Sequence, residues 1–222
     1  MSIRIIGATS GFTEINAPAV AGSNTLVLPG GNGTARQILM GDGAGTLSFV
    51  NDAGALFFRL NADLAGANVA TAQNIFGVGV TLAASTVYAF DFAIIFTKSA
   101  GTTSHTIGIG YGGTATLNNI AWRGEGVQDG GTLPFARNLS TQTSFASNST
   151  ANLVVSTAST AAGVIAHYRI TGTVSINGGG TFVPQYTLSA APGGAYSTVA
   201  GSYIRFVPIG AAGSNSSQGT WS

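Results

Sequence analysis

Large apolar side chains alternate with smaller or polar ones along much of the chain after residue 86. In the segment TVYAFDFAIIFTK (86–98), the large residues on one side are Tyr88, Phe90, Phe92, Ile94 and Phe96. The opposite side carries Val87, Ala89, Asp91, Ala93 and Ile95. The segment HYRITGTVSI (167–176) repeats the pattern, with Tyr168, Ile170, Val174 and Ile176 on its apolar side. A period of two predicts β-strands with one face buried in a core.

Three further segments with this character are HTIGIGYGG (105–113), TFVPQYTLSA (181–190) and SYIRFVPIG (202–210). Glycine alternates with large residues in the first, which predicts close approach of a neighbouring backbone or ring. Pro184 and Pro208 predict a sheet edge or a bulge, because proline cannot donate a ladder hydrogen bond. Only 71–76 has a short helical character. We therefore expect an all-β chain with an antiparallel β-sandwich or jelly-roll-like domain.

The first fifty residues offer only short apolar pieces. These pieces are TLVLPG (25–30), QILMG (37–41) and TLSFV (46–50). Each is shorter than a sheet normally needs to be stable without a partner. We place a boundary at the turn-like NDAG (51–54). It divides the chain into an N-terminal β-rich anchoring or trimerisation segment, 1–54, and a C-terminal β-sandwich domain, 55–222.

Association between copies is the simplest way to cover the apolar residues of the N-terminal segment. Three chains around one axis would bury these side chains together, which predicts a homotrimer. The candidate contact residues are Leu26, Leu28, Ile38, Leu47 and Phe49. Further candidates for contacts between chains are Arg36, Arg59 and Arg137. A planar guanidinium can hold carboxylates or carbonyl oxygens across an interface.

Composition supports a protein that lies against other protein surfaces. Of 222 residues, 33 are glycine and only 7% are charged, against about 25% charged in a typical soluble domain. Few charges mean a small desolvation cost when the surface is covered. The formal net charge of +1 argues against nucleic-acid binding, which requires a basic surface. We expect no signal peptide and no membrane insertion, because no run of about 20 apolar residues occurs.

The segment INAPAVAGSNTLVLPGGNGTARQILMGDGAGTLSFV (15–50) resembles a segment found in tail fibres and other surface proteins of tailed bacteriophages. The stretches IGIGYGGTAT, YRITGTVSINGGGTFVPQYTLS and the closing GTWS are similar to a phage structural module. The resemblance implies a homotrimeric virion component with a β-rich head, assembled in the host cytoplasm. Its partners would be its own copies, tail, baseplate or major capsid proteins, and a host surface glycan or protein.

Two places on the virion are consistent with this resemblance. The first is a short tail or baseplate fibre that mediates attachment to the host, since the long shaft repeats of long fibres do not occur in this sequence. The second is a capsid decoration, or cement, protein that stabilises the head. Low charge suits either role.

A polysaccharide-degrading, tailspike-like enzyme is a minor alternative. Such an enzyme needs two carboxylates roughly 5 to 10 Å apart at the sugar. The best local cluster is Trp122, Arg123, Glu125 and Asp129, in WRGEGVQDGGT (122–132). In such an enzyme Trp122 would stack on a sugar ring. We expect instead a solvated loop with a half-buried tryptophan, and we interpret the four residues as exposed-loop binding candidates of a protein that is not an enzyme.

The remaining motifs indicate structural roles. The glycine stretches 41–46 and 108–113 open no helix, so we interpret them as turns and tight strand packing. The spacing of His105 and His167 is no metal signature, and both are expected to be exposed on strands. We expect Asp91 to accept hydrogen bonds or to pair with an arginine, since its strand is apolar. We expect Trp221 to pack the C-terminus onto the fold, and no cofactor or metal is implied.

Overall fold

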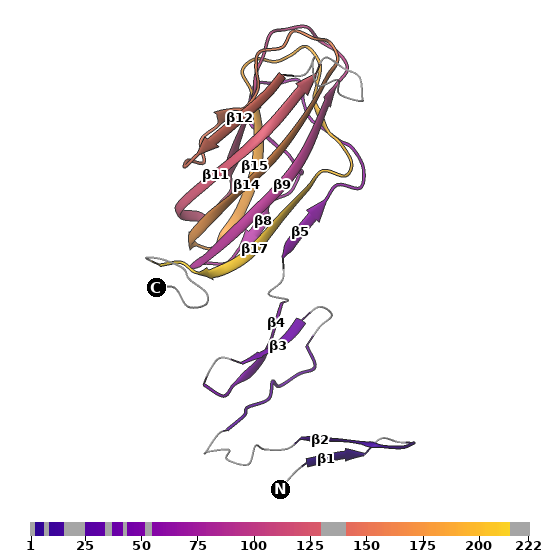
Figure 1. Cartoon of the computed structure of the whole chain (residues 1–222), viewed down its shortest axis with the longest axis vertical. Helices are drawn as coiled ribbons and strands as arrows, with labels where there is room; N and C mark the ends of the chain where they lie inside the picture. Colours follow the sequence, from indigo (N-terminus) through magenta and orange to yellow (C-terminus); the bar gives the residue numbers. More distant parts are fainter. Residues whose placement is uncertain are drawn as a thin grey trace. The chain divides into compact units, whose positions relative to one another are not determined.

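A computed structural model of the chain describes residues 3–6, 9–15, 25–33, 37–41, 44–51, 55–129 and 141–213. The chain divides into two units, Met1–Ala53 and Gly54–Ser222, where the sequence placed its boundary between residues 54 and 55. All the regular elements of the described residues are β-strands (Figure 1). The expected all-β class is confirmed. The short helix expected at 71–76 is wrong, because residues Gln73–Asn74 form strand β7, which pairs with β15.

The described residues of the N-terminal unit form two separate two-stranded antiparallel sheets. They are β1 (Ile3–Ile6) with β2 (Phe12–Ile15), and β3 (Gln37–Gly41) with β4 (Leu47–Asn51). Val27 adds a parallel bridge to Thr46, and the Val27 N–H donates to the Gly45 carbonyl at 2.8 Å. Two-stranded ribbons of this length are marginally stable at best in water.

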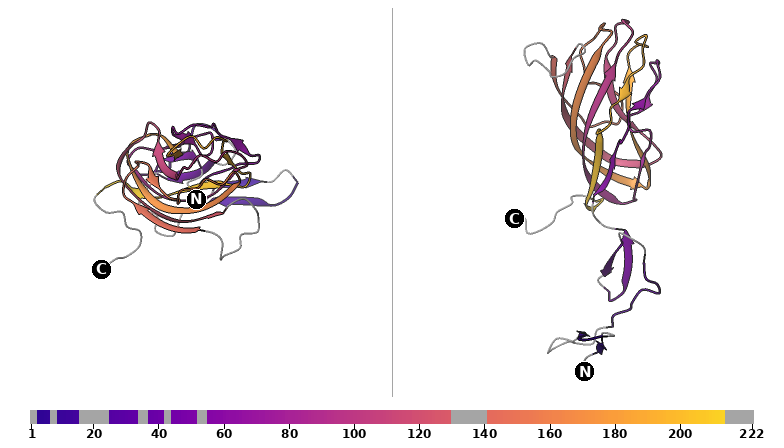
Figure 2. Two further views of the ribbon diagram at one scale, coloured as in Figure 1. Left: turned by 90° about the horizontal axis from the view of Figure 1, so that it is seen from above. Right: turned by 90° about the vertical axis from the view of Figure 1, so that its right-hand side faces the viewer.

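The C-terminal unit is a sandwich of two antiparallel sheets (Figures 1 and 2). The eight-stranded sheet has the order β12-β11-β14-β9, and beyond β9 lie β17 with β5 and, separately, β16 with β6. Its strands are β5 (Leu56–Arg59), β6 (Leu64–Ala65), β9 (Thr86–Lys98), β11 (Thr116–Asp129), β12 (Thr141–Ser147), β14 (Val164–Gly178), β16 (Ser197–Thr198) and β17 (Tyr203–Ala211).

The five-stranded sheet has the order β13-β10-β15, and both β7 and β8 pair with the far side of β15. Its strands are β7 (Gln73–Asn74), β8 (Val80–Leu82), β10 (Ile107–Gly112), β13 (Leu153–Val154) and β15 (Gly180–Leu188). The inner faces of the two sheets enclose a single apolar core.

The alternation in β9 and β14 matches the sequence pattern. The five large residues of β9 and the four of β14 are buried, as expected. Aromatic rings join the two layers: Phe90 lies 6.2 Å from Phe182, and Phe96 lies 4.9 Å from Tyr186, between ring centroids. Ring pairs at these distances add stabilisation beyond the apolar area that they bury.

The prolines mark the irregularities of the large and small sheets. The expected bulge at Pro208 is confirmed by a register shift between Pro208 and Gly210 in the pairing of β17 with β9. Pro184 lies where the partner of β15 changes from β8 to β7, and its carbonyl accepts a hydrogen bond from the Ile75 N–H at 3.0 Å. Pro184, which has no N–H, therefore lies between the residues of β15 that pair with β8 and those that pair with β7.

Candidate binding surfaces

The cluster expected in a loop lies on a strand. Trp122, Arg123, Glu125 and Asp129 all belong to β11, which pairs with β12 on one side and β14 on the other. The loop prediction is wrong because Gly124 and Gly126 have a packing role. A Cβ atom at Gly124 would lie 2.7 Å from the Phe145 ring, and one at Gly126 would collide with the Tyr168 ring.

Trp122 faces the core and is only 3% exposed. Its indole N–H donates to the Ser149 carbonyl at 2.9 Å, and its ring meets Tyr111 edge to face at 5.3 Å. The expected half-buried position of this tryptophan in a loop is therefore corrected, since Trp122 is a buried core residue of strand β11. Asp129 ends β11, and its side chain lies outside the described part of the structure.

Arg123 and Glu125 lie on the outer face of the large sheet and are exposed. Strand register places Glu125 opposite Arg169 of β14 and Ser144 of β12, and it places Arg123 opposite Thr171. These five side chains line an open polar groove of about 550 Å³. A second hollow of about 490 Å³ shares Glu125, Ser144 and Arg169 with the first and extends to His167.

Two guanidinium groups in this polar groove are unpaired among the described residues. Among the described residues, neither Arg123 nor Arg169 makes a hydrogen bond or an ion pair within 4 Å. Burial lowers the pKa of His167, and the positive charge of Arg169 lowers it further, while Glu125 acts in the opposite direction. With His167 neutral, the polar groove carries two positive charges and one negative charge on strand residues.

The described lining of the polar groove offers hydrogen-bond donors and hydroxyls. Glu125 is the carboxylate among the described lining residues, and the side chain of Asp129 lies outside them. Guanidiniums bind carboxylates and phosphates, so these side chains are suited to a polar or anionic ligand.

Asp91 lies on the same outer face and pairs with an arginine, as the sequence predicted. The Arg205 Nη2 and Nε atoms both lie 2.8 Å from the Asp91 Oδ1 atom. This pair neutralises its own charges, in contrast to Arg123 and Arg169 of the polar groove.

The expected exposure of His105 is wrong. His105 is 2% exposed, and its ring nitrogens lie 2.8 Å from the Tyr196 hydroxyl and 2.7 Å from the Thr103 carbonyl. Its partner Tyr196 supplies the polar contact that makes burial tolerable. His105 is a structural residue of the core and lies away from the polar groove.

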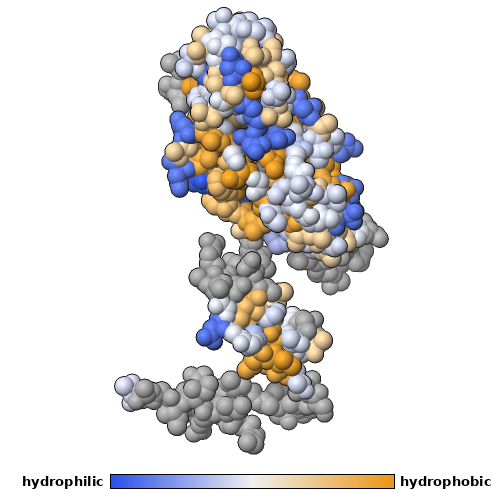
Figure 3. Space-filling model, turned by 180° about the vertical axis from the view of Figure 1, so that it is seen from behind, coloured by the Kyte–Doolittle hydropathy of each residue, from blue (hydrophilic) through white to orange (hydrophobic). Residues whose placement is uncertain are grey.

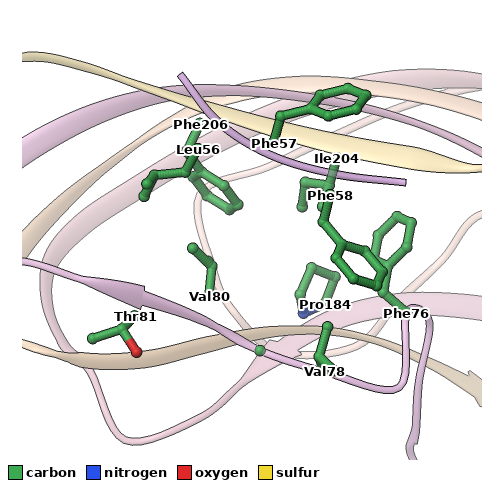
Figure 4. Close-up of a pocket in the computed structure, with 11 residues that line it drawn as sticks. Leu56, Phe57, Phe58, Phe76, Val78, Val80, Thr81, Pro184, Ile204 and Phe206 are labelled. Carbon is green, nitrogen blue, oxygen red and sulfur yellow. The ribbon is translucent and has the colours of Figure 1, made fainter. Parts of the chain in front are cut away.

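An apolar slot opens where the edges of the two sheets meet (Figure 4). It has a volume of about 350 Å³. Leu56 and Phe58 of β5 point into it from one side, and Val78 and Val80 line the other side. Phe57 points away from the slot and stacks on Tyr203 at 5.7 Å between ring centroids. The described lining contains no charged side chain.

The N-terminal unit also leaves apolar side chains uncovered (Figure 3). The candidate contact residues Leu26, Leu28 and Ile38 are 63%, 68% and 42% exposed. Leu47 and Phe49 are half-buried, and the Phe49 ring lies against Gly33.

Among the arginines proposed for contacts between chains, Arg59 is exposed and donates to Asn61 at 3.0 Å. Arg36, Arg137 and Trp221 lie outside the described residues. Within the described ranges, no helix is long and apolar enough to cross a membrane. The same ranges contain no group of three histidine or acidic side chains that could hold a metal ion.

No protein-family model matches the chain, and no curated protein matches it. Among solved structures, the chain has a faint likeness to one described as "Structure of infectious bursal disease virus Gt strain", with 8% sequence identity and a TM-score of 0.11. The match covers 91% of this chain and 48% of that chain, so this chain spans about half the length of the matched one. A likeness at this level carries no argument about fold or function.

Proposed function

We propose that the protein is a structural component of a bacteriophage virion, a homotrimeric short tail or baseplate fibre that mediates attachment to the host surface. The observation that carries the proposal is the N-terminal unit, whose described residues form strands but include no buried apolar side chain. Three of its leucines, Leu26, Leu28 and Leu39, are exposed, up to 68% at Leu28, and exposed apolar clusters mark surfaces that a partner covers. This unit is the anchor in the proposal.

The sandwich domain is the part that faces the host in this proposal. The polar groove lies on paired strands, so its backbone is already ordered and only its side chains lose freedom on binding. A homotrimer presents three copies of the groove, and several fibres on one particle multiply weak contacts into firm attachment. The resemblance of residues 15–50 to tail-fibre segments supports the same role.

Imaging of labelled virions tests the proposal. An antibody against the sandwich domain is expected to decorate the tail or baseplate, and particles that lack the protein are expected to stay intact but to lose adsorption. Decoration of the head, together with fragile particles, would instead favour the capsid decoration role. Absence of the protein from particles would overturn both.

The enzyme alternative has a separate test. Purified protein is incubated with host polysaccharide, and released sugars are measured for the wild type and for Glu125→Gln. Our proposal expects no release by either. Release that disappears in Glu125→Gln would establish the tailspike-like activity and would replace attachment as the main role.

A further inference from the structure

Strand β5 is an apolar edge strand that the described part of the sandwich domain leaves uncovered. All four of its residues, Leu56–Arg59, are exposed, and Phe57 is 59% exposed. Among the described strands β5 pairs only with β17, so its other edge presents free backbone donors and acceptors. Natural edge strands are usually protected by charge, proline or a covering segment. In β5 only Arg59, at its end, offers such protection.

The apolar slot continues this uncovered surface into the sandwich. Val78, at its mouth, is 47% exposed, and Leu56 and Phe58 are each 38% exposed. Because the described lining of the slot has no charged residue, a ligand or partner that fills it is selected by apolar shape and not by charge. A second copy of this chain, whose surface carries few charges, is an apolar partner of this kind.

The short connection between β4 and β5 indicates which molecule covers the apolar slot. Strand β4 ends at Asn51 and β5 begins at Leu56, and these five residue steps span at most about 18 Å, whatever path they take. Copies that associate through their N-terminal units therefore hold their β5 strands within reach of one another. No other apolar strand edge in the described sandwich is tethered so closely to the N-terminal unit.

We propose that β5 and the apolar slot form the contact between the sandwich domains of neighbouring copies. A second copy of this chain covers Phe57 and Val78, and rotational symmetry closes the contact into a ring. The inference rests on the proposed self-association of the N-terminal unit and adds a second, specific interface to it. It also explains why an apolar sequence persists at the edge of an otherwise well-packed sheet.

Full-length variants test the contact by analytical ultracentrifugation over a range of concentrations. Phe57→Asp and Val78→Asp are each expected to raise the dissociation constant of the assembly at least about tenfold, because buried apolar residues dominate such interfaces. Val154→Asp is the matched control: Val154 is 53% exposed but lies on β13, at the other side of the small sheet. It is expected to leave the dissociation constant unchanged.

A cross-linking measurement covers the case in which an aspartate variant does not fold. The photoreactive aromatic residue p-benzoylphenylalanine replaces Phe57 in the full chain, and adducts that join two chains are expected on irradiation. If the wild type assembles, but adducts form only within one chain and the folded aspartate variants still assemble, this contact is wrong and self-association stands. If the wild-type chain is a monomer at every concentration, both the contact and the proposed homotrimer are overturned.

Discussion

The ammonium group of Lys98 donates to the carbonyl oxygen of Ala161 at 2.7 Å, which ties the end of β9 to the loop that precedes β14. The carbonyls of Ala100, Gly101 and Ala162 also accept from this group, at 3.1, 2.7 and 3.2 Å. Lys98 is the only lysine in the sequence, and it is 4% exposed. Burial lowers the pKa of Lys98, and the four carbonyls offset that cost by solvating the charge.

Lys98→Met is therefore expected to destabilise the sandwich. The substitution keeps most of the apolar stem but leaves buried carbonyl oxygens without a donor, so we expect a loss of about 2–3 kcal/mol in the free energy of unfolding. Urea unfolding followed by tryptophan fluorescence measures it. Arg123→Met removes the same charge from an exposed, unpaired position and should change the midpoint little. Equal midpoints for Lys98→Met and the wild type would contradict the structural role.

Gly172 is expected to be intolerant of a methyl group. It lies in the middle of β14, where a Cβ atom would be 2.7 Å from the Phe90 ring and 2.8 Å from the Trp122 Cβ atom. These neighbours are buried and cannot move aside cheaply, so Gly172→Ala should cost about 1–3 kcal/mol. Gly213→Ala is the control, because nothing lies within 4 Å of that position. Thermal melting compares the two, and a Gly172→Ala protein as stable as the control would refute the overpacking argument.

Local patterns predicted the strands well but not their partners. The alternation in 86–98 and 167–176 fixes which residues face the core, because side chains alternate along any strand. His105 was misjudged because its partner Tyr196 lies far away in the sequence. Nothing near His105 signals that contact.

The polar groove shows the same limit. Arg123 and Glu125 were recognised as candidates, but Arg169 was not, although it falls on the polar side of the 167–176 pattern. Only strand register brings Arg169 opposite Glu125, and register depends on pairing across the sheet. The sequence predicts a loop around Trp122 because Gly124 and Gly126 are typical of loops. Glycines are equally typical of strands whose neighbours leave no room for a side chain.

Buried tyrosines predict unfolding at high pH. Burial raises the pKa of Tyr186 to about 12, against about 10 in an unfolded chain. The folded state therefore binds this proton more tightly, so its contribution to stability is complete below pH 10 and is lost as the pH rises to 12.

Unfolding in urea at pH 9, 10, 11 and 12 measures this loss. Tyr186→Phe has no such proton and should lose less stability than the wild type over the same range. Burial also raises the pKa values of Tyr111, Tyr168 and Tyr196, so the variant should retain part of the effect. An identical pH dependence in Tyr186→Phe and the wild type would show that this residue does not contribute.

The arginines of the polar groove are expected to control attachment if the proposed function holds. Arg123→Ala and Arg169→Ala each remove an unpaired guanidinium group from a strand of the large sheet. We expect each variant to lower the adsorption of particles to host cells about tenfold, because that is the effect of losing one hydrogen bond to a charged group. Adsorption should also weaken at high salt, because exposed charges are screened. Arg205→Ala is the matched control, since that arginine is paired with Asp91 on the same sheet outside the groove. Equal adsorption by all three variants would show that the host is bound elsewhere on the protein.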